Sequence, residues 1–261
     1  MSLLNEIIYH KQEEIALQKK KVTKQMLMRD INIRSRDFIK ALSTPELSLI
    51  AEIKYRSPSA GVLPDMRAPV IRARDYEQCG AQAISVLTDD RFFGGSREHL
   101  KEVRANTGLP VLRKDFILDE YQIYESRFIG ADAILLIVRL INERVLKRFI
   151  KIANELIMTP LVEVGTEDEI AQAVNANAQC IGINNRDLDT LEIDLGRSIR
   201  LKKYVPEHYI TIAESGIKSR EDMQKIEGAG FNGVLIGHAL AVSPCAQDAI
   251  ESLQGGSSDR A

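Results

Sequence analysis

Eight short apolar runs, rich in β-branched residues, recur along this chain and limit its fold more than any other feature. They begin about 20 to 35 residues apart, which is the period of a strand followed by a helix. The predicted strands span residues 47–53, 83–87, 110–112, 133–138, 160–164, 180–183, 209–213 and 233–236. Apolar strands that alternate with helices predict a parallel sheet covered by helices. Eight such units favour a closed (β/α)8 TIM barrel over an open, doubly wound sheet.

Signals for the starts and ends of helices lie between the predicted strands. Thr166 and Glu169 match a capping box that opens a helix over residues 167–176. Asn142 is a predicted N-cap for a second helix. The apolar face of that helix is Leu146, Ile150, Ala153 and Ile157. Further predicted caps and helix ends are Asp119, Ser219, Gly130 and Gly228.

The length of the chain, 261 residues, fits one barrel domain, because α/β barrels run to about 250 residues as a single unit. Residues 1–46 precede the first predicted strand and carry a helical pattern of apolar residues, so we expect an N-terminal helical extension packed on the barrel. The barrel itself is predicted over residues 47–253. Residues 254–261 are small and polar, and we expect a flexible tail there.

Charge and cysteine content limit the partners and the compartment. Acidic and basic residues nearly balance at a net charge of −2, which argues against binding to nucleic acid or to a membrane surface. The most apolar run, 133–141, is far shorter than the roughly 20 residues of a membrane span, and the N-terminus has no apolar signal core. Cys79, Cys180 and Cys245 are widely spaced, so we expect reduced thiols in a cytoplasmic protein.

Two classes of motif are rejected on their context. Residues 228–233 match the spacing GxGxxG, but a dinucleotide-binding loop must follow a strand and open a helix. Here the glycines close a predicted helix and lead into a strand. The isolated histidines are His10, His99, His208 and His238, and they predict no metal site. We therefore expect an activity that uses neither a metal nor a nucleotide cofactor.

Charged and amide side chains interrupt the apolar strands near their carboxyl ends. Glu52 and Lys54 are two residues apart, so the pleat of the strand places both on one face. Later strand ends carry Lys114, Glu163, Asn184 and Ser215. In a closed barrel these ends meet at one rim, where active sites of this fold are built. Each residue alone could be an ordinary helix cap or a solvated side chain, but together they predict an acid–base site.

Serines and glycines in three loops predict a phosphate site. Ser57 and Ser59 follow the first strand. Ser215 and Gly216 follow the seventh strand, and Gly237 follows the eighth. Glycine lets backbone N–H groups approach an anion, and the last two loops of this fold commonly bind phosphate. The alternative is that these glycines only make tight turns between strands and helices.

Seven segments carry a more specific signal. They are 50–61 (IAEIKYRSPSAG), 85–89 with 92–96, 111–117 (VLRKDFI), 161–164, 181–188 (IGINNRDL), 213–217 (AESGI) and 234–237. In this order they resemble the indole-3-glycerol phosphate synthase family of tryptophan biosynthesis. The resemblance implies a carboxy-lyase that closes the ring of 1-(2-carboxyphenylamino)-1-deoxyribulose 5-phosphate to give indole-3-glycerol phosphate, with loss of CO2 and water.

The resemblance also implies roles for individual residues. Lys114 would be the general acid that protonates the ribulose carbonyl oxygen as the aromatic carbon attacks. In the later dehydration Lys54 would assist the departure of hydroxide, and Glu52 would act as base. Glu163 and Asn184 match positions that hold and polarise the substrate, and Glu163 is a second acid–base candidate.

Other positions carried over by resemblance bind the substrate. Those implied for the phosphate are Ser57, Ser215, Gly216, Gly237 and His238, the last through its backbone. Arg186 matches a position near polar groups of the substrate. Those implied for the anthranilate pocket are Phe93, Phe116, Leu135 and Leu188, although the two phenylalanines could instead be core aromatics. His238 departs from the family, which more often has Ser, Glu or Thr there, and the chain has no Trp to cover the anthranilate ring.

The implied partner is a small phosphorylated substrate, and we expect a monomer or at most a weak homodimer. No cofactor is implied, because the electrons released on decarboxylation move into the substrate's own iminium. The nearest rival is a phosphate-binding barrel like phosphoribosylanthranilate isomerase, which pairs a Cys and an Asp on strands one and six. This chain has Glu52 and Lys54 on the first strand and Asn184 on the sixth. A barrel that binds a ligand without catalysis is the other alternative.

Overall fold

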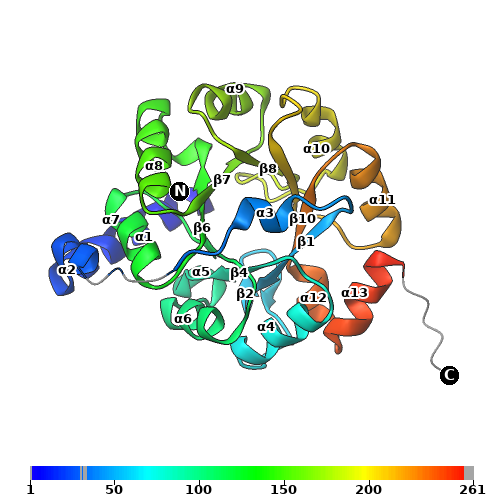
Figure 1. Ribbon diagram of the computed structural model, residues 1–261, viewed down its shortest axis with the longest axis horizontal. Coiled ribbons are helices and arrows are strands. Elements are labelled where there is room, and N and C mark those ends of the chain that lie inside the picture. The colour runs from blue at the N-terminus through cyan, green and yellow to red at the C-terminus, as the bar shows by residue number, and fades with distance from the viewer. Residues whose placement is uncertain (1, 30, 32–33, 256–261) are drawn as a thin grey trace.

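The computed structural model describes residues 2–29, 31 and 34–255, and Figure 1 shows its ribbon. Most of the predicted tail at 254–261 therefore lies outside the described residues. Within the described part of the chain, every helix is too short or too polar to cross a membrane.

Eight parallel strands close into a barrel, in the order β1, β10, β9, β8, β7, β6, β5 and β4. They are β1 (Ser48–Ile53), β4 (Ala83–Leu87), β5 (Val111–Lys114), β6 (Ala133–Ile137), β7 (Thr159–Val164), β8 (Cys180–Asn184), β9 (Ile210–Glu214) and β10 (Gly233–Ile236). β1 pairs with both β4 and β10, and this double pairing closes the sheet. The predicted TIM barrel is confirmed, with strand limits that differ by about two residues at most. After β1, β2 (Arg56–Ser57) and β3 (Gly61–Val62) form a small antiparallel ribbon.

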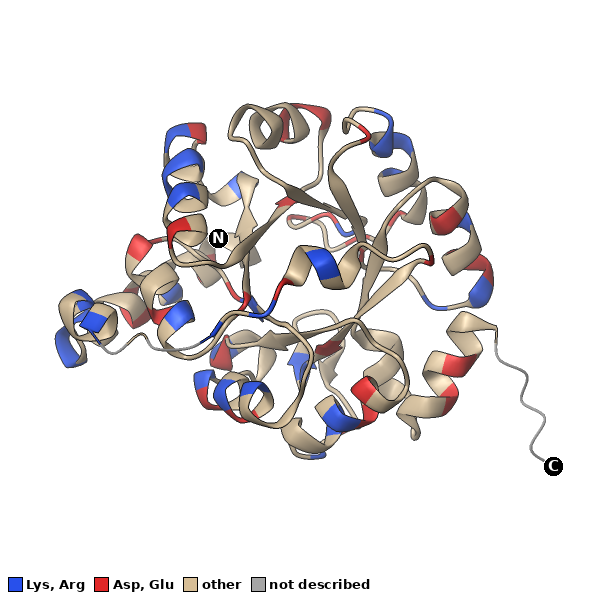
Figure 2. Cartoon of the chain, in the orientation of Figure 1, with Lys and Arg blue, Asp and Glu red and all other residues tan. Residues whose placement is uncertain are grey.

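Helices surround the barrel on its outer face (Figure 1). They are α4 (Pro69–Gln78), α5 (Asp90–Phe93), α6 (Arg97–Asn106), α7 (Glu120–Phe128), α8 (Glu143–Glu155), α9 (Glu167–Asn175), α10 (Leu195–Lys202), α11 (Arg220–Gly228), α12 (His238–Val242) and α13 (Ala246–Gln254), with the 3-10 turn η1 (Val138–Leu140) after β6. The predicted N-caps Asp119, Asn142 and Ser219 each accept a hydrogen bond from a backbone N–H of the first turn. Figure 2 shows acidic and basic residues interspersed over these outer helices.

Two local predictions need correction. The Thr166 hydroxyl accepts from the N–H of Glu169 at 3.2 Å, but the Glu169 carboxylate accepts from Gly165 at 2.6 Å instead of closing the capping box on Thr166. Ile157 was predicted on the buried face of a helix, yet α8 ends at Glu155 and Ile157 is 73% exposed with a φ of 57°. The chain must turn there to enter β7, and Met158 occupies the buried position instead.

The N-terminal extension packs on both ends of the barrel. Its helices are α1 (Leu3–Lys21), α2 (Lys24–Arg29) and α3 (Phe38–Leu42). Leu4 and Ile7 of α1 lie at the carboxyl ends of the strands, where they line a cavity. Phe38 and Leu42 of α3 are fully buried against the barrel interior, and the Leu42 carbonyl accepts from Ser48 at the start of β1. The first helix thus belongs to the functional end and the third closes the opposite end.

Alternation along each strand divides the core into an inner and an outer layer. Ile50 and Leu112 belong to the cluster inside the barrel, whereas Leu49, Ala51 and Ile53 pack between the sheet and the helices. On four strands, the residue two positions beyond an inner apolar residue is polar and also points inward: Glu52, Lys114, Glu163 and Glu214. This is why polar residues from distant parts of the sequence share the mouth of the barrel.

Candidate active site

A cavity of about 390 Å³ opens at the carboxyl ends of the barrel strands. Every site residue predicted from the sequence lines it, and the structure therefore brings the whole set together. From the acid–base set these are Glu52, Lys54, Lys114, Glu163 and Asn184. From the substrate-binding set they are Ser57, Phe93, Phe116, Leu135, Arg186, Leu188, Ser215, Gly216, Gly237 and His238.

Glu52 and Lys54 form an ion pair on β1 and the loop after it. The Lys54 ammonium lies 2.8 Å from Glu52 Oε1. The Glu52 carboxylate is only 4% exposed, and burial alone would raise its pKa. The positive charges of Lys54 and Lys114 outweigh burial and hold the pKa of Glu52 below its ordinary value. Glu52 therefore stays ionised and keeps a lysine ammonium beside it.

Lys114 lies between two carboxylates from other strands. Its Nζ is 3.0 Å from Glu163 Oε2 and 2.7 Å from Glu214 Oε2. Burial disfavours the ammonium, but the surrounding glutamates outweigh it and hold the pKa of Lys114 well above its ordinary value. The group is a charged proton donor fixed in place from two sides.

Glu163 is fixed through both of its oxygens. Oε2 contacts Lys114, and Oε1 accepts from Asn184 Nδ2 at 3.0 Å. The Asn184 Oδ1 in turn accepts from the N–H of Arg186 at 2.9 Å. This hydrogen bond fixes the orientation of the amide, so that its Nδ2 faces Glu163. The carboxyl ends of β7 and β8 are thus held together by the hydrogen bond between Glu163 and Asn184.

Glu214, the last residue of β9, also lines the cavity but was not among the site residues predicted from the sequence. It is 1% exposed, and among the described residues no group hydrogen-bonds to its buried Oε1. Burial raises its pKa to about 7 despite Lys114 nearby. A Cβ on Gly182 of β8 would lie 2.1 Å from Oε1, so a larger residue there would displace this carboxylate. The signal was available, since Glu214 lies at an inward position of its strand, but only the adjacent Ser215 was chosen.

The loops after β9 and β10 make a rim of backbone and cationic side chains. Ser215 and Gly216 both have left-handed backbones, with φ of 67° and 87°, a conformation that costs about 1–3 kcal/mol for a non-glycine residue. Burial and the positive charges of Lys54, Lys218 and Arg186 lower the pKa of His238. Such a concentration of positive charge suits an anion. Lys218 was not predicted from the sequence.

Gly237 has a second structural role besides the one predicted. A Cβ at this position would lie 2.2 Å from Glu52 Oε1. Glycine is therefore required at the start of α12 so that the last strand can pack against a carboxylate of the first strand.

Another part of the cavity wall, away from the loops after β9 and β10, is apolar. The ring centroids of Phe93 and Phe116 are 6.0 Å apart with an interplanar angle of 40°. Leu4 and Ile7 of α1 add to this wall, a position of α1 that was not predicted from the sequence. A planar aromatic group fits between such side chains.

Among residues 2–29, 31 and 34–255, no group of three or more His, Cys, Asp or Glu side chains is arranged to hold a metal ion.

The closed barrel, with paired ammonium and carboxylate groups at its mouth, defines a (β/α)8-barrel enzyme with an acid–base site. A family model described as indole-3-glycerol phosphate synthase matches residues 4–253. The chain belongs to the indole-3-glycerol phosphate synthase family.

Individual relatives agree with this assignment. An indole-3-glycerol phosphate synthase of Chloroherpeton thalassium is 45% identical over 249 residues, which cover 93% of this chain and 96% of the relative. One from Legionella pneumophila is 46% identical over 241 residues, 92% of this chain and 93% of the relative.

Solved structures of other enzymes share the fold alone. A 3-hexulose-6-phosphate synthase has a TM-score of 0.65 at 15% identity and covers 80% of this chain and 99% of its own. A thiamine phosphate pyrophosphorylase from Pyrococcus furiosus has a TM-score of 0.60 at 16% identity and covers 80% of this chain and 94% of its own.

Proposed function

We propose that this chain converts 1-(2-carboxyphenylamino)-1-deoxyribulose 5-phosphate to indole-3-glycerol phosphate in the biosynthesis of tryptophan. Family membership supports the reaction. The single observation that supports the mechanism is the Lys114 ammonium, fixed 3.0 Å from Glu163 and 2.7 Å from Glu214 inside the cavity.

Ring closure begins with a proton transfer from Lys114. The aromatic carbon that bears the carboxylate attacks the ribulose carbonyl carbon, and the ammonium protonates the carbonyl oxygen as the new C–C bond forms. A positioned general acid contributes roughly 10²–10⁴-fold to such a step. The C–CO2 bond then breaks, and its electrons move into the substrate's own iminium, which restores the aromatic ring.

Dehydration follows at the Glu52–Lys54 pair. Lys54 donates a proton to the hydroxyl, which leaves as water, and Glu52 accepts the proton that is lost when the indole double bond forms. The two groups are 2.8 Å apart, so a proton passed from Glu52 to Lys54 restores both.

One proton is consumed overall, because the substrate carboxylate leaves as neutral CO2. Glu214 is suited to supply it, since a carboxyl with a pKa of about 7 is partly protonated at neutral pH and contacts Lys114. The protonated Glu214 would recharge Lys114 and regain its own proton from water when the cavity is open.

Substrate binding divides between the two walls of the cavity. The phosphate would lie at the rim formed by Ser57, Gly216, Gly237 and the His238 backbone, where left-handed glycine and nearby cations favour an anion. The anthranilate ring would lie against Phe93 and Phe116, with Leu135 and Leu188 beside them.

We place the enzyme in the cytoplasm and propose that it acts as a monomer, without nucleic-acid or membrane partners. Cys79, Cys180 and Cys245 are free thiols, the state typical of a reducing compartment.

The direct test is turnover of the carboxyphenylamino-deoxyribulose phosphate, followed by the fluorescence of the indole product. We expect product formation by the purified chain without added metal or cofactor. Tight binding of this substrate without product would instead indicate a ligand-binding barrel, and isomerisation of phosphoribosylanthranilate would indicate the rival enzyme.

A further inference from the structure

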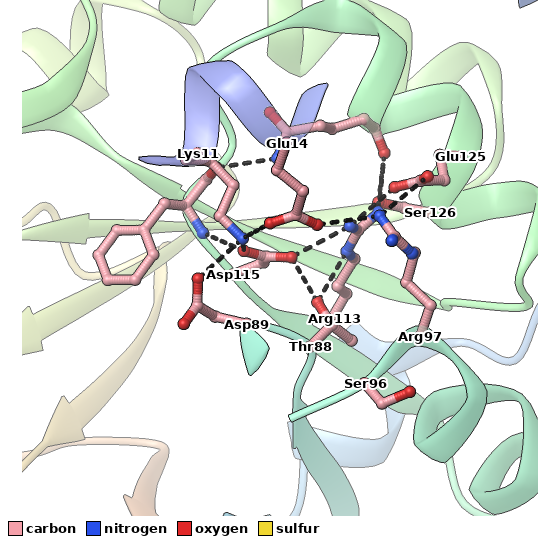
Figure 3. Close-up of polar contacts among 12 residues, drawn as sticks. Lys11, Glu14, Thr88, Asp89, Ser96, Arg97, Arg113, Asp115, Glu125 and Ser126 are labelled. Carbon is pink, nitrogen blue, oxygen red and sulfur yellow. Dashed lines mark hydrogen bonds and ion pairs between the residues drawn. The ribbon is translucent and has the colours of Figure 1, made fainter. Parts of the chain in front are cut away.

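A second ionic cluster lies at the end of β5, between this strand and helices α1 and α7 (Figure 3). Its centre is Arg113, the neighbour of Lys114 on β5, which is 1% exposed. Each N–H of the guanidinium has an acceptor within 3.2 Å. The acceptors are Thr88 Oγ1, the Gln122 carbonyl, Ser126 Oγ, Asp115 Oδ2 and Glu125 Oε2.

Asp115 is the member of this cluster that touches the active-site backbone. Its Oδ2 accepts from Thr88 Oγ1 at 2.5 Å and from Arg113 at 3.0 Å. Its Oδ1 accepts from the N–H of Phe116 at 2.8 Å. The N–H of Thr88 also donates to the Lys114 carbonyl at 3.1 Å, so the peptides on both sides of Asp115 are fixed.

The two residues that flank Asp115 both line the cavity. Lys114 presents its ammonium and Phe116 presents its ring. Asp115 also borders the cavity, but it is 2% exposed and its carboxylate oxygens contact Lys11, Thr88 and Arg113 of the cluster. A carboxylate held on all sides at this point acts as an anchor for the strand end. A shift of this backbone would move the acid and the aromatic wall together.

The last contact to Asp115 comes from the start of the chain. The Lys11 ammonium of α1 is 2% exposed and lies 2.9 Å from Asp115 Oδ1, 2.8 Å from Asp89 Oδ2 and 2.8 Å from Glu14 Oε2. Figure 3 shows Asp115 between Lys11 and Arg113. Every N–H of the ammonium therefore has a carboxylate partner.

We propose that Asp115 is a positioning residue: it fixes the backbone that places the Lys114 ammonium in the cavity, and Lys11 of α1 secures Asp115. This inference rests on the proposed function, in which Lys114 is the general acid. A misplacement of an acid by about 1 Å can cost about 10²-fold in rate, so the anchor affects the chemical step more than substrate binding.

The test compares kcat and KM of wild type with the variants Asp115→Asn, Lys11→Met and Thr88→Val, each well below its unfolding temperature. We expect Asp115→Asn to lower kcat about tenfold or more and to change KM less than about threefold. Lys11→Met and Thr88→Val, which each remove one contact to Asp115, should lower kcat by about threefold or more. Lys19→Met is the matched control, because Lys19 also joins α1 to the barrel, through Asp119, but has no contact with Asp115.

A double-mutant cycle tests whether Lys11 acts through Asp115. Adding Lys11→Met to Asp115→Asn should lower kcat less than about twofold further. The proposal is wrong if folded Asp115→Asn keeps kcat within twofold of wild type, or if the two effects multiply. If Asp115→Asn does not fold, wild-type kcat in both Lys11→Met and Thr88→Val overturns it. Absence of turnover in the wild type would instead contradict the proposed function itself.

Discussion

Arg113 and Lys114 are neighbours on β5, yet the ionic groups around them differ in kind. On the outer side, each N–H of Arg113 has an acceptor within the protein, so this guanidinium is fully hydrogen-bonded. On the inner side, the pKa of Glu214 is raised to about 7, and within the described part of the chain its Oε1 has no hydrogen-bond partner. A buried carboxylate with a raised pKa that faces a cavity is a candidate for proton transfer, which the saturated outer cluster does not offer.

The largest effect should follow from loss of the inner cation. Lys114→Ala removes the proton donor, and we expect kcat to fall by about 10² or more while the circular dichroism spectrum stays that of the wild type. Lys101→Ala is the control, because this exposed lysine pairs with Glu98 on its own helix and does not line the cavity. A Lys114→Ala variant that retains near-normal turnover would show that the inner group is not catalytic.

Loss of Arg113, the cation on the outer side of β5, should lower the stability of the fold, whereas loss of Lys114 should lower the activity. Arg113→Met leaves Asp115 and Glu125 buried with fewer partners, and we expect the free energy of unfolding to fall by about 3–5 kcal/mol in denaturant titrations. Arg148→Met removes an exposed ion pair with Glu120 and should cost no more than about 1 kcal/mol. Equal losses of unfolding free energy in Arg113→Met and Arg148→Met would show that the buried cluster stabilises the fold no more than an exposed ion pair does.

A single added methyl group can displace the charged groups that face the cavity without removing any of their charges. Gly237→Ala would place a Cβ 2.2 Å from Glu52 Oε1, so we expect kcat/KM to fall about tenfold as the Glu52–Lys54 pair shifts. Gly228→Ala is the matched control, since nothing lies within 4 Å of the added atom there. Equal activity in both alanine variants would mean that the cavity tolerates displacement of Glu52.

The smallest expected effect is a pH dependence of stability. Burial raises the pKa of Glu214 from 4.5 to about 7, so the folded protein binds this proton more tightly than the unfolded chain. Its contribution to stability is therefore full below about pH 4.5 and is lost as the pH rises through about 7. The unfolding temperature of Glu214→Gln, relative to wild type, should be higher at pH 8 than at pH 5. A difference independent of pH, or one of opposite sign, would refute the raised pKa.

Strand positions and the catalytic rim could be predicted because both follow from local pattern. Side chains alternate between the two faces of a strand, which fixes those that point inward, and the barrel then brings Lys54, Lys114 and Glu163 together. Glu214 was missed because the prediction for the end of that strand rested on the adjacent Ser215. The docking of Leu4 and Ile7 depends on the burial of Lys11 among carboxylates from two distant loops, which no local spacing reveals.

The pairing of β1 with β10 has one more consequence. The seam of the barrel, where the first strand to be synthesised meets the last, passes through the cavity, with Gly237 seated against Glu52 across it. A nascent or truncated chain that lacks either edge of this seam cannot place Gly237 against Glu52. The lining of the cavity is therefore complete only when nearly the whole polypeptide has been synthesised.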